Sequence, residues 1–118
     1  MNIRMTIDGQ VLSATLVDSA AARDFLGLLP LTLDLEDYAA TEKIAQLPRK
    51  LSTAGAPAGT TPAIGDITYY APWGNLAIFY KGFRHSPGLV KLGRIDGDIQ
   101  VLRAAGPLKT RIEVAEPH

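Results

Sequence analysis

Residues 65–80 read GDITYYAPWGNLAIFY, and this stretch decides the fold more than any other part of the chain. It predicts two strands, one from Asp66 to Ala71 and one from Leu76 to Lys81. The tetrapeptide Pro72-Trp73-Gly74-Asn75 between them consists mainly of turn-forming residues. The two strands are therefore expected to lie close together, joined by a turn that presents a tryptophan.

Aromatic side chains gather in and beside these two strands. Six of the chain's eight aromatic residues lie within fifteen positions, namely Tyr69, Tyr70, Trp73, Phe79, Tyr80 and Phe83. Because successive strand residues point to opposite faces, each adjacent pair is expected to place one ring in the core and one at the surface. Two interpretations stay open for the cluster: a packed core with its turn, or the wall of a ligand groove.

The N-terminal segment predicts a hairpin. Apolar and polar residues alternate from Ile3 to Ile7, and Asp8-Gly9 is a strong signal for a two-residue turn. This turn sets Ile7 opposite Gln10. Because directly opposed residues share a face, one apolar surface results from Ile3, Met5, Leu12, Ala14 and Leu16.

A helix and a strand are expected next. Asp18 or Ser19 can cap the helix, which Pro30 ends, and its apolar side chains at helical spacing are Ala22, Phe25, Leu26 and Leu29. Alternation from Leu31 to Glu36 then predicts a half-buried strand, with Asp34 and Glu36 on its water-facing side. A short helical turn is expected around residues 42–47, stopping at Pro48.

The second half of the chain alternates loops and strands. Residues 52–62 are almost wholly Ser, Thr, Ala, Gly and Pro, which predicts a long surface loop, and residues 83–88 form another loop. Residues 89–95 and 108–114 are expected to be strands. The segment 98–105 is either a hairpin arm or a short helix, and the helix is preferred because the hairpin would mix apolar and polar side chains on one face.

These elements define the fold class. No helix of 10 to 15 residues separates each strand from the next, so the pattern disfavours a doubly wound parallel sheet. We expect a mostly β chain forming one domain over residues 1–118. A closed β-barrel is predicted, with one helix near the N-terminus and a short helix near the C-terminus.

The amino-acid composition argues against several classes of function. Twelve basic residues balance twelve acidic ones, so the positive field that nucleic acid requires is missing. The chain has no cysteine, which removes disulfides, thiolate catalysis and cysteine-ligated zinc. No metal site, nucleotide-binding loop or other cofactor site is predicted. The longest strongly apolar run, residues 76–80, is too short to span a membrane, and a cytoplasmic location is expected by default.

The chain resembles cyclophilin, and more specifically the small bacterial cyclophilin-like proteins. The similarity covers nearly the whole sequence, is most specific over residues 65–80, and also involves residues 29–33, 37–44, 47–51 and 92–95. It implies a cyclophilin-like barrel. A cyclophilin isomerase needs a Phe-His-Arg string followed by Phe-x-x-Gln-Gly-Gly, and neither occurs here. Arg49 precedes the long loop, roughly where the family's arginine would come.

We expect a groove that binds a peptide segment or a small molecule. Its predicted lining is Tyr70, Trp73, Phe79 and Phe83, edged by Arg49, Arg84 and His85. The leading interpretation is a cyclophilin-like binding module without the usual isomerase residues. The alternatives are a divergent peptidyl-prolyl isomerase that uses Arg49 to polarise the proline amide, and a structural partner domain that acts through an exposed strand edge.

Overall fold

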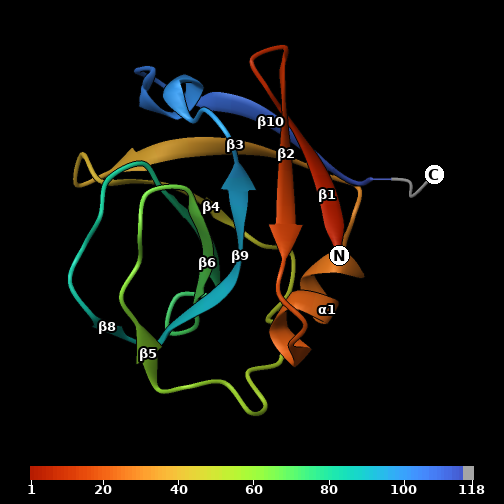
Figure 1. Ribbon diagram of the computed structural model, residues 1–118, viewed down its shortest axis with the longest axis vertical. Helices are drawn as coiled ribbons and strands as arrows, with labels where there is room; N and C mark the ends of the chain where they lie inside the picture. Colours follow the sequence, from red (N-terminus) through yellow and green to blue (C-terminus); the bar gives the residue numbers. More distant parts are fainter. Residues whose placement is uncertain (116–118) are drawn as a thin grey trace.

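Eight antiparallel strands close into a barrel in the computed structural model, which describes residues 1–115 (Figure 1). Around the barrel the order is β1 (Asn2–Ile7), β10 (Leu108–Val114), β3 (Leu31–Tyr38), β4 (Glu42–Gln46), β7 (Asn75–Phe79), β6 (Asp66–Tyr70), β9 (Leu89–Asp96) and β2 (Gln10–Leu16). The strand next to β2 is β1, so the sheet has no open edge. The mostly β, closed-barrel prediction is confirmed.

The two hairpins predicted from the sequence are both present. In β1 and β2, Met5 lies opposite Leu12 and Ile7 opposite Gln10, as the Asp8-Gly9 turn requires. In β6 and β7, Tyr69 lies opposite Leu76. The inward-facing side chains Ile3, Met5, Ile7, Ile67, Tyr69, Leu76 and Ile78 are at most 1% exposed, and they form much of the core.

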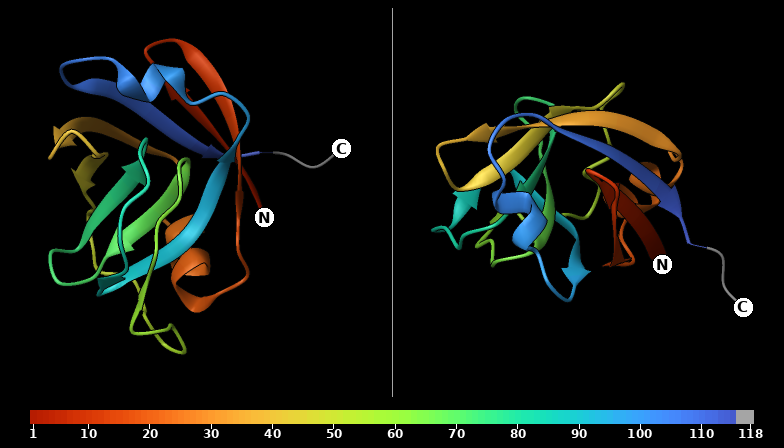
Figure 2. Two further views of the ribbon diagram at one scale, coloured as in Figure 1. Left: turned by 60° about the vertical axis from the view of Figure 1, so that its left-hand side comes forward. Right: turned by 90° about the horizontal axis from the view of Figure 1, so that it is seen from above.

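Two helical segments cover the ends of the barrel (Figures 1 and 2). Helix α1 (Ala20–Leu26) is capped by Ser19, whose Oγ accepts a hydrogen bond from the Ala22 amide, and it buries Phe25. It ends at Leu26 with Gly27 as its C-cap, and Leu26 lies four residues before the expected stop at Pro30. The predicted second helix is a single turn of 3₁₀ helix, η1 (Gln100–Arg103), which buries Leu102 completely.

The predicted helical turn at residues 42–47 is wrong, because this segment is strand β4. Its backbone pairs with β3 on one side, where Glu42 faces Tyr38, and with β7 on the other. Lys43 and Ala45 point into the barrel, whereas Glu42 and Ile44 point outward. Pairing with two neighbouring strands satisfies the backbone fully, and this outweighs a weak local preference for a helix.

The two predicted loops each contain a short strand. Strand β5 (Gly59–Thr60) lies in the 52–62 loop and β8 (Ser86–Pro87) lies in the 83–88 loop, and the two pair with each other as a small second sheet. The Gly88 amide also donates to the carbonyl of Ala58 at 2.7 Å. The loops therefore support each other above the outer face of the barrel.

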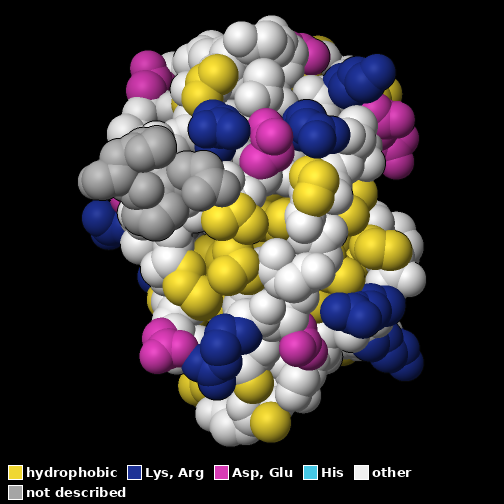
Figure 3. Space-filling model, turned by 90° about the vertical axis from the view of Figure 1, so that its right-hand side faces the viewer, with side chains coloured by type: hydrophobic (Ala, Val, Ile, Leu, Met, Phe, Trp, Pro, Cys, Tyr) yellow, Lys and Arg dark blue, Asp and Glu magenta, His cyan; other side chains and the backbone are white. Residues whose placement is uncertain are grey.

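The molecular surface is mixed in character. On the side formed by α1, β1 and β10, hydrophobic side chains gather in a band between charged groups (Figure 3). Ion pairs join Glu113 to Arg4 on β1 and to Arg111 on β10, with N–O distances of 3.7 and 3.5 Å. Within residues 1–115, no helix has the length and apolar character that crossing a membrane requires.

Candidate functional site

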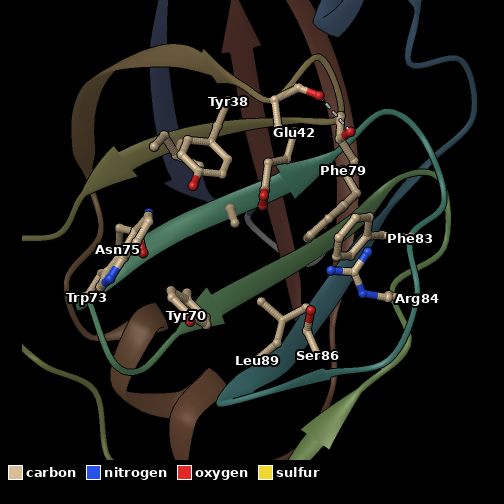
Figure 4. Close-up of a pocket in the computed structure, with 14 residues that line it drawn as sticks. Tyr38, Glu42, Tyr70, Trp73, Asn75, Phe79, Phe83, Arg84, Ser86 and Leu89 are labelled. Carbon is tan, nitrogen blue, oxygen red and sulfur yellow. Dashed lines mark hydrogen bonds between the residues drawn. The ribbon is translucent and has the colours of Figure 1, made fainter.

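A pocket of about 300 Å³ lies on the outer face of the barrel, over β4, β7, β6 and the start of β9 (Figure 4). It is lined by Tyr38, Ala39, Thr41, Glu42, Ile44, Tyr70, Trp73, Asn75, Ala77, Phe79, Phe83, Arg84, Ser86 and Leu89. These residues come from six strands and from the three connections that follow β3, β6 and β7. The site therefore exists only in the folded barrel.

Strand β7 forms the floor, and its register explains the hollow. Asn75, Ala77 and Phe79 point outward, whereas Leu76 and Ile78 point into the barrel. Asn75 and Phe79 are four residues apart, about 13 Å along the strand. The small side chain of Ala77 lies between them, opposite Ile44 on β4 and Thr68 on β6. The floor is therefore lowest at its centre.

Three aromatic rings stand at the Asn75 end of the pocket. The Trp73 ring makes edge-to-face contacts with Tyr38 and with Tyr70, at centroid distances of 5.7 and 5.2 Å and interplanar angles of 80° and 85°. Gln46 Nε2 donates to the carbonyl oxygens of Trp73 and Gly74, each at 3.1 Å, and so fixes the turn. Trp73 is nevertheless 53% exposed, which leaves its ring accessible from solvent.

At the Phe79 end of the pocket, the wall consists of two stacked phenylalanine rings and an arginine. The Phe83 ring is stacked on Phe79 with a centroid distance of 6.5 Å, and the Arg84 guanidinium lies 4.6 Å from the centroid of Phe83. The Phe83 amide donates to the carbonyl of Pro62 at 3.2 Å, which ties this segment to the long loop. Phe79 is covered to 2% exposure by this packing. The expectation that one ring of Phe79 and Tyr80 would lie at the surface is therefore wrong.

Glu42 is the carboxylate of the pocket. It projects into the pocket between Tyr38 and Phe79 (Figure 4). Partial burial raises the pKa of Glu42 to about 6, because a desolvated carboxylate loses favourable hydration. Within residues 1–115, its carboxylate has no ion-pair or hydrogen-bond partner.

Asn75 supplies a second unsatisfied acceptor. Its side chain is 5% exposed, and its Oδ1 is buried without a hydrogen bond from any residue of the described chain. A buried carbonyl without a donor costs about 1–3 kcal/mol. Neighbouring atoms cover this oxygen, so a ligand N–H or O–H can donate to it only when a side chain of the pocket wall moves aside.

The structure brings together five of the seven side chains that the sequence assigned to a groove. Tyr70, Trp73, Phe79, Phe83 and Arg84 all line the pocket. Arg49 and His85 are exposed, and neither is among the lining residues. The side chain of His85 is turned toward Gly59 on β5. Their assignment to the groove edge has no support in this geometry, and ligand binding by the other five stays a prediction.

Sequence reasoning missed Tyr38, Glu42 and Asn75. A helical turn at residues 42–47 does not predict that Glu42 points outward, as strand alternation does. Asn75 was expected in the turn after Trp73 and not in a strand. A signal was available in the sequence. Reading residues 42–46 as a strand opposite 75–79 places Glu42 next to Phe79 on one face.

The comparisons with known proteins agree with this architecture. A family model described as the Cyclophilin-like family matches residues 5–115. The solution structure of a hypothetical protein from Archaeoglobus fulgidus superimposes with a TM-score of 0.69 at 15% sequence identity, covering 98% of this chain and 95% of that chain. At this identity the likeness concerns the fold alone. No significant match was found among curated proteins.

Proposed function

The chain belongs to the cyclophilin-like family, and on that premise we propose that it is a binding module whose outer-face pocket takes a small molecule or a short peptide segment. The observation that carries this proposal is the pocket itself. Five aromatic rings surround a hollow above Ala77, the Glu42 carboxylate projects into it, and the Asn75 Oδ1 is buried in its wall without a hydrogen-bond donor. Aromatic walls with a few convergent polar groups are typical of ligand sites.

Two further properties support a binding role. The volume of about 300 Å³ is at the lower end of the range for small-molecule pockets, which suits a ligand of modest size or one peptide side chain. The floor consists of paired strands, which hold the lining side chains rigidly, so little conformational entropy is lost when a ligand binds.

The isomerase alternative rests on the family alone. Arg49, which that mechanism would need beside the bound proline, is exposed and does not line the pocket. Coupled proteolysis of a proline-containing peptide tests it directly. Turnover that is abolished by Arg49→Ala would replace the binding proposal with the enzymatic one, and absence of turnover would remove the alternative.

The single tryptophan provides the test of the binding proposal. Trp73 lines the pocket and is half exposed, so a ligand that contacts it changes its fluorescence. We would titrate the protein with proline-containing peptides and with a library of neutral, anionic and cationic metabolites. At least one compound is expected to give a saturable change in emission.

A pocket-filling variant separates binding in the pocket from contact elsewhere. Ala77→Leu adds three carbons to the floor, and Ala63→Leu makes the same change at an exposed position outside the lining. Saturable binding should be lost in Ala77→Leu and retained in Ala63→Leu, with folding of both checked by circular dichroism. If Ala77→Leu does not fold, Ala77→Val makes the smaller change. Equal binding by Ala77→Leu and Ala63→Leu would contradict the proposal. It would also be contradicted if no compound in the library changed the Trp73 emission.

A further inference from the structure

The three rings at the Asn75 end form the sides of a box. The Trp73 plane lies at 80° to Tyr38 and at 85° to Tyr70, so the indole stands nearly perpendicular to both phenols. Perpendicular aromatic walls present more than one π face or edge to an enclosed group. The negative faces of aromatic rings attract organic cations, most strongly where tryptophan contributes.

The polar groups beside this box are acceptors. Glu42 brings a carboxylate into the pocket from β4, and none of the ion pairs within residues 1–115 involves it. Asn75 brings its unsatisfied Oδ1 from β7. The Glu42 carboxylate favours a ligand that donates N–H or O–H hydrogen bonds or carries positive charge, and the buried Asn75 Oδ1 adds negative potential to the wall behind it.

The charged and titratable groups that face Glu42 are few. From β3 and β6 it faces the phenols of Tyr38 and Tyr70, and from the segment after β7 it faces Arg84. Glu42 lies opposite Phe79 in the pairing of β4 with β7, and its side chain projects between Tyr38 and Phe79. The Arg84 guanidinium lies over Phe83, on the side away from the Trp73 ring, and is exposed to water, so solvent screens its charge. The part of the pocket between Glu42 and Trp73 therefore holds one negative charge and no positive one.

We propose that this half of the pocket binds an organic ammonium group, held by the rings of Tyr38, Trp73 and Tyr70 and neutralised by Glu42. The inference rests on the proposed binding function and names the chemical class of its ligand. The cationic headgroup would lie against these rings inside the pocket of about 300 Å³, with the remainder of the ligand over Ala77 toward Arg84. An alkylammonium metabolite and a methylated lysine side chain share this chemistry.

Two probes of the same shape test the role of charge. Choline carries a trimethylammonium group, and 3,3-dimethyl-1-butanol replaces its nitrogen with carbon. Both would be titrated against wild-type protein, followed by Trp73 fluorescence and by chemical shifts of the pocket residues. Choline is expected to bind about tenfold more tightly than the alcohol, the factor that a partly desolvated cation–π contact supplies.

A charge-matched pair of variants tests the role of the carboxylate. Glu42→Gln removes the charge from the pocket, whereas Glu36→Gln removes the same charge from β3 at an exposed position outside the lining. Choline binding should weaken about tenfold or more in Glu42→Gln. It should stay within about twofold of wild type in Glu36→Gln.

The pH dependence of choline affinity provides an independent test of the role of the Glu42 carboxylate. Because Glu42 has a pKa of about 6, choline binding should strengthen as the pH rises from 5 to 8 and level off above 7. The profile should be flat in Glu42→Gln. Histidine is the other side chain that ordinarily changes charge in this range, so His85→Gln is the control, and it should leave the profile unchanged.

The failure of this inference differs from the failure of the proposed function. If neutral or anionic compounds titrate Trp73 while choline does not, or if the alcohol binds as tightly as choline, the ammonium assignment is overturned and the binding function stands. Choline binding that is indifferent to Glu42→Gln also overturns it. If neither choline nor any library compound changes the fluorescence of Trp73, both the ammonium assignment and the binding function are overturned.

Discussion

Lys43 donates a hydrogen bond from Nζ to the carbonyl oxygen of Ala104 at 2.9 Å, and thereby ties strand β4 to the residue that follows η1. The lysine is 1% exposed, which is rare for an ammonium group. Its charge is balanced by Asp37, whose Oδ1 lies 3.5 Å away and also accepts a hydrogen bond from the Tyr80 hydroxyl. This cluster closes one end of the barrel and is separate from the pocket.

Asp37→Asn is expected to destabilise the protein, because it leaves the buried Lys43 ammonium without a counter-charge. The Asp37 side chain is 42% exposed, so screening by water reduces the effect to about 1–2 kcal/mol. Urea unfolding measures it. Asp34→Asn is the matched control on the same strand, because Asp34 is exposed, and it should change the free energy of unfolding by less than about 0.5 kcal/mol. Equal effects of the two variants would show that the Lys43 pairing contributes nothing.

Tyr80→Phe should change the acid dependence of stability. The Tyr80 hydroxyl is the main reason that the pKa of Asp37 is lowered from 3.8. A lowered pKa in the folded state adds stability that is present above pH 3.8 and is lost as the pH falls through the folded value. The variant should therefore be less stable than wild type near pH 7, and the two stability curves should converge as the pH falls through the lowered pKa of Asp37. Urea unfolding across this range tests the prediction, and parallel curves would contradict it.

Glu42→Gln should stabilise the protein in the absence of ligand at neutral pH. Burial raises the pKa of Glu42 from 4.5 to about 6, so folding favours its protonated form. The stability gained from that form is present below pH 4.5 and is lost as the pH rises through 6. The variant should gain about 1–2 kcal/mol at pH 7.5 and nothing at pH 4. A loss of stability at pH 7.5 would mean that Glu42 has a structural partner in solution.

Gly93→Ala should destabilise the barrel at the contact of β9 with β2. A Cβ at this position would overlap the carbonyl of Thr15 and lie 2.8 Å from Leu16 Cα, and backbone atoms cannot move aside cheaply. The expected cost is about 1–3 kcal/mol. Gly27→Ala is the control, since Gly27 has φ −68° and its Cβ would approach nothing closer than 3.4 Å. That variant should be neutral or slightly stabilising in thermal unfolding.

The sequence by itself determined the hairpins and most of the strands. The Asp8-Gly9 turn fixed the register of β1 with β2, because a two-residue turn leaves one way to align the alternating apolar residues. The run from Asp66 to Tyr80 fixed β6, β7 and the exposed turn that carries Trp73. These features depend on residues close together in the chain, where turn geometry and side-chain alternation suffice.

Half of the candidate site could also be predicted from the sequence. The aromatic residues that line the pocket lie within fourteen positions of one another, from Tyr70 to Phe83, and only Tyr38 comes from elsewhere. The polar half could not be predicted. Arg49 and His85 looked suitable by residue type, but a loop side chain takes its direction from long-range packing, which a single sequence does not reveal.

Only the tertiary structure decided that residues 42–46 form a strand. This strand positions both the buried Lys43 beside Asp37 and the Glu42 carboxylate in the pocket. Locally the segment favours a helical turn as much as a strand, and the choice depends on β3 and β7 being present to pair with it on either side. Once it is paired, strict alternation sends Lys43 into the barrel toward Asp37 and Glu42 outward into the aromatic pocket. The pairing with β3 is local, but the pairing with β7 joins residues 29 to 37 positions apart in the chain, from Gln46–Asn75 to Glu42–Phe79. This long-range partner supplied the missing information, because hydrogen bonding in a sheet is satisfied by neighbours in space and not by neighbours in sequence.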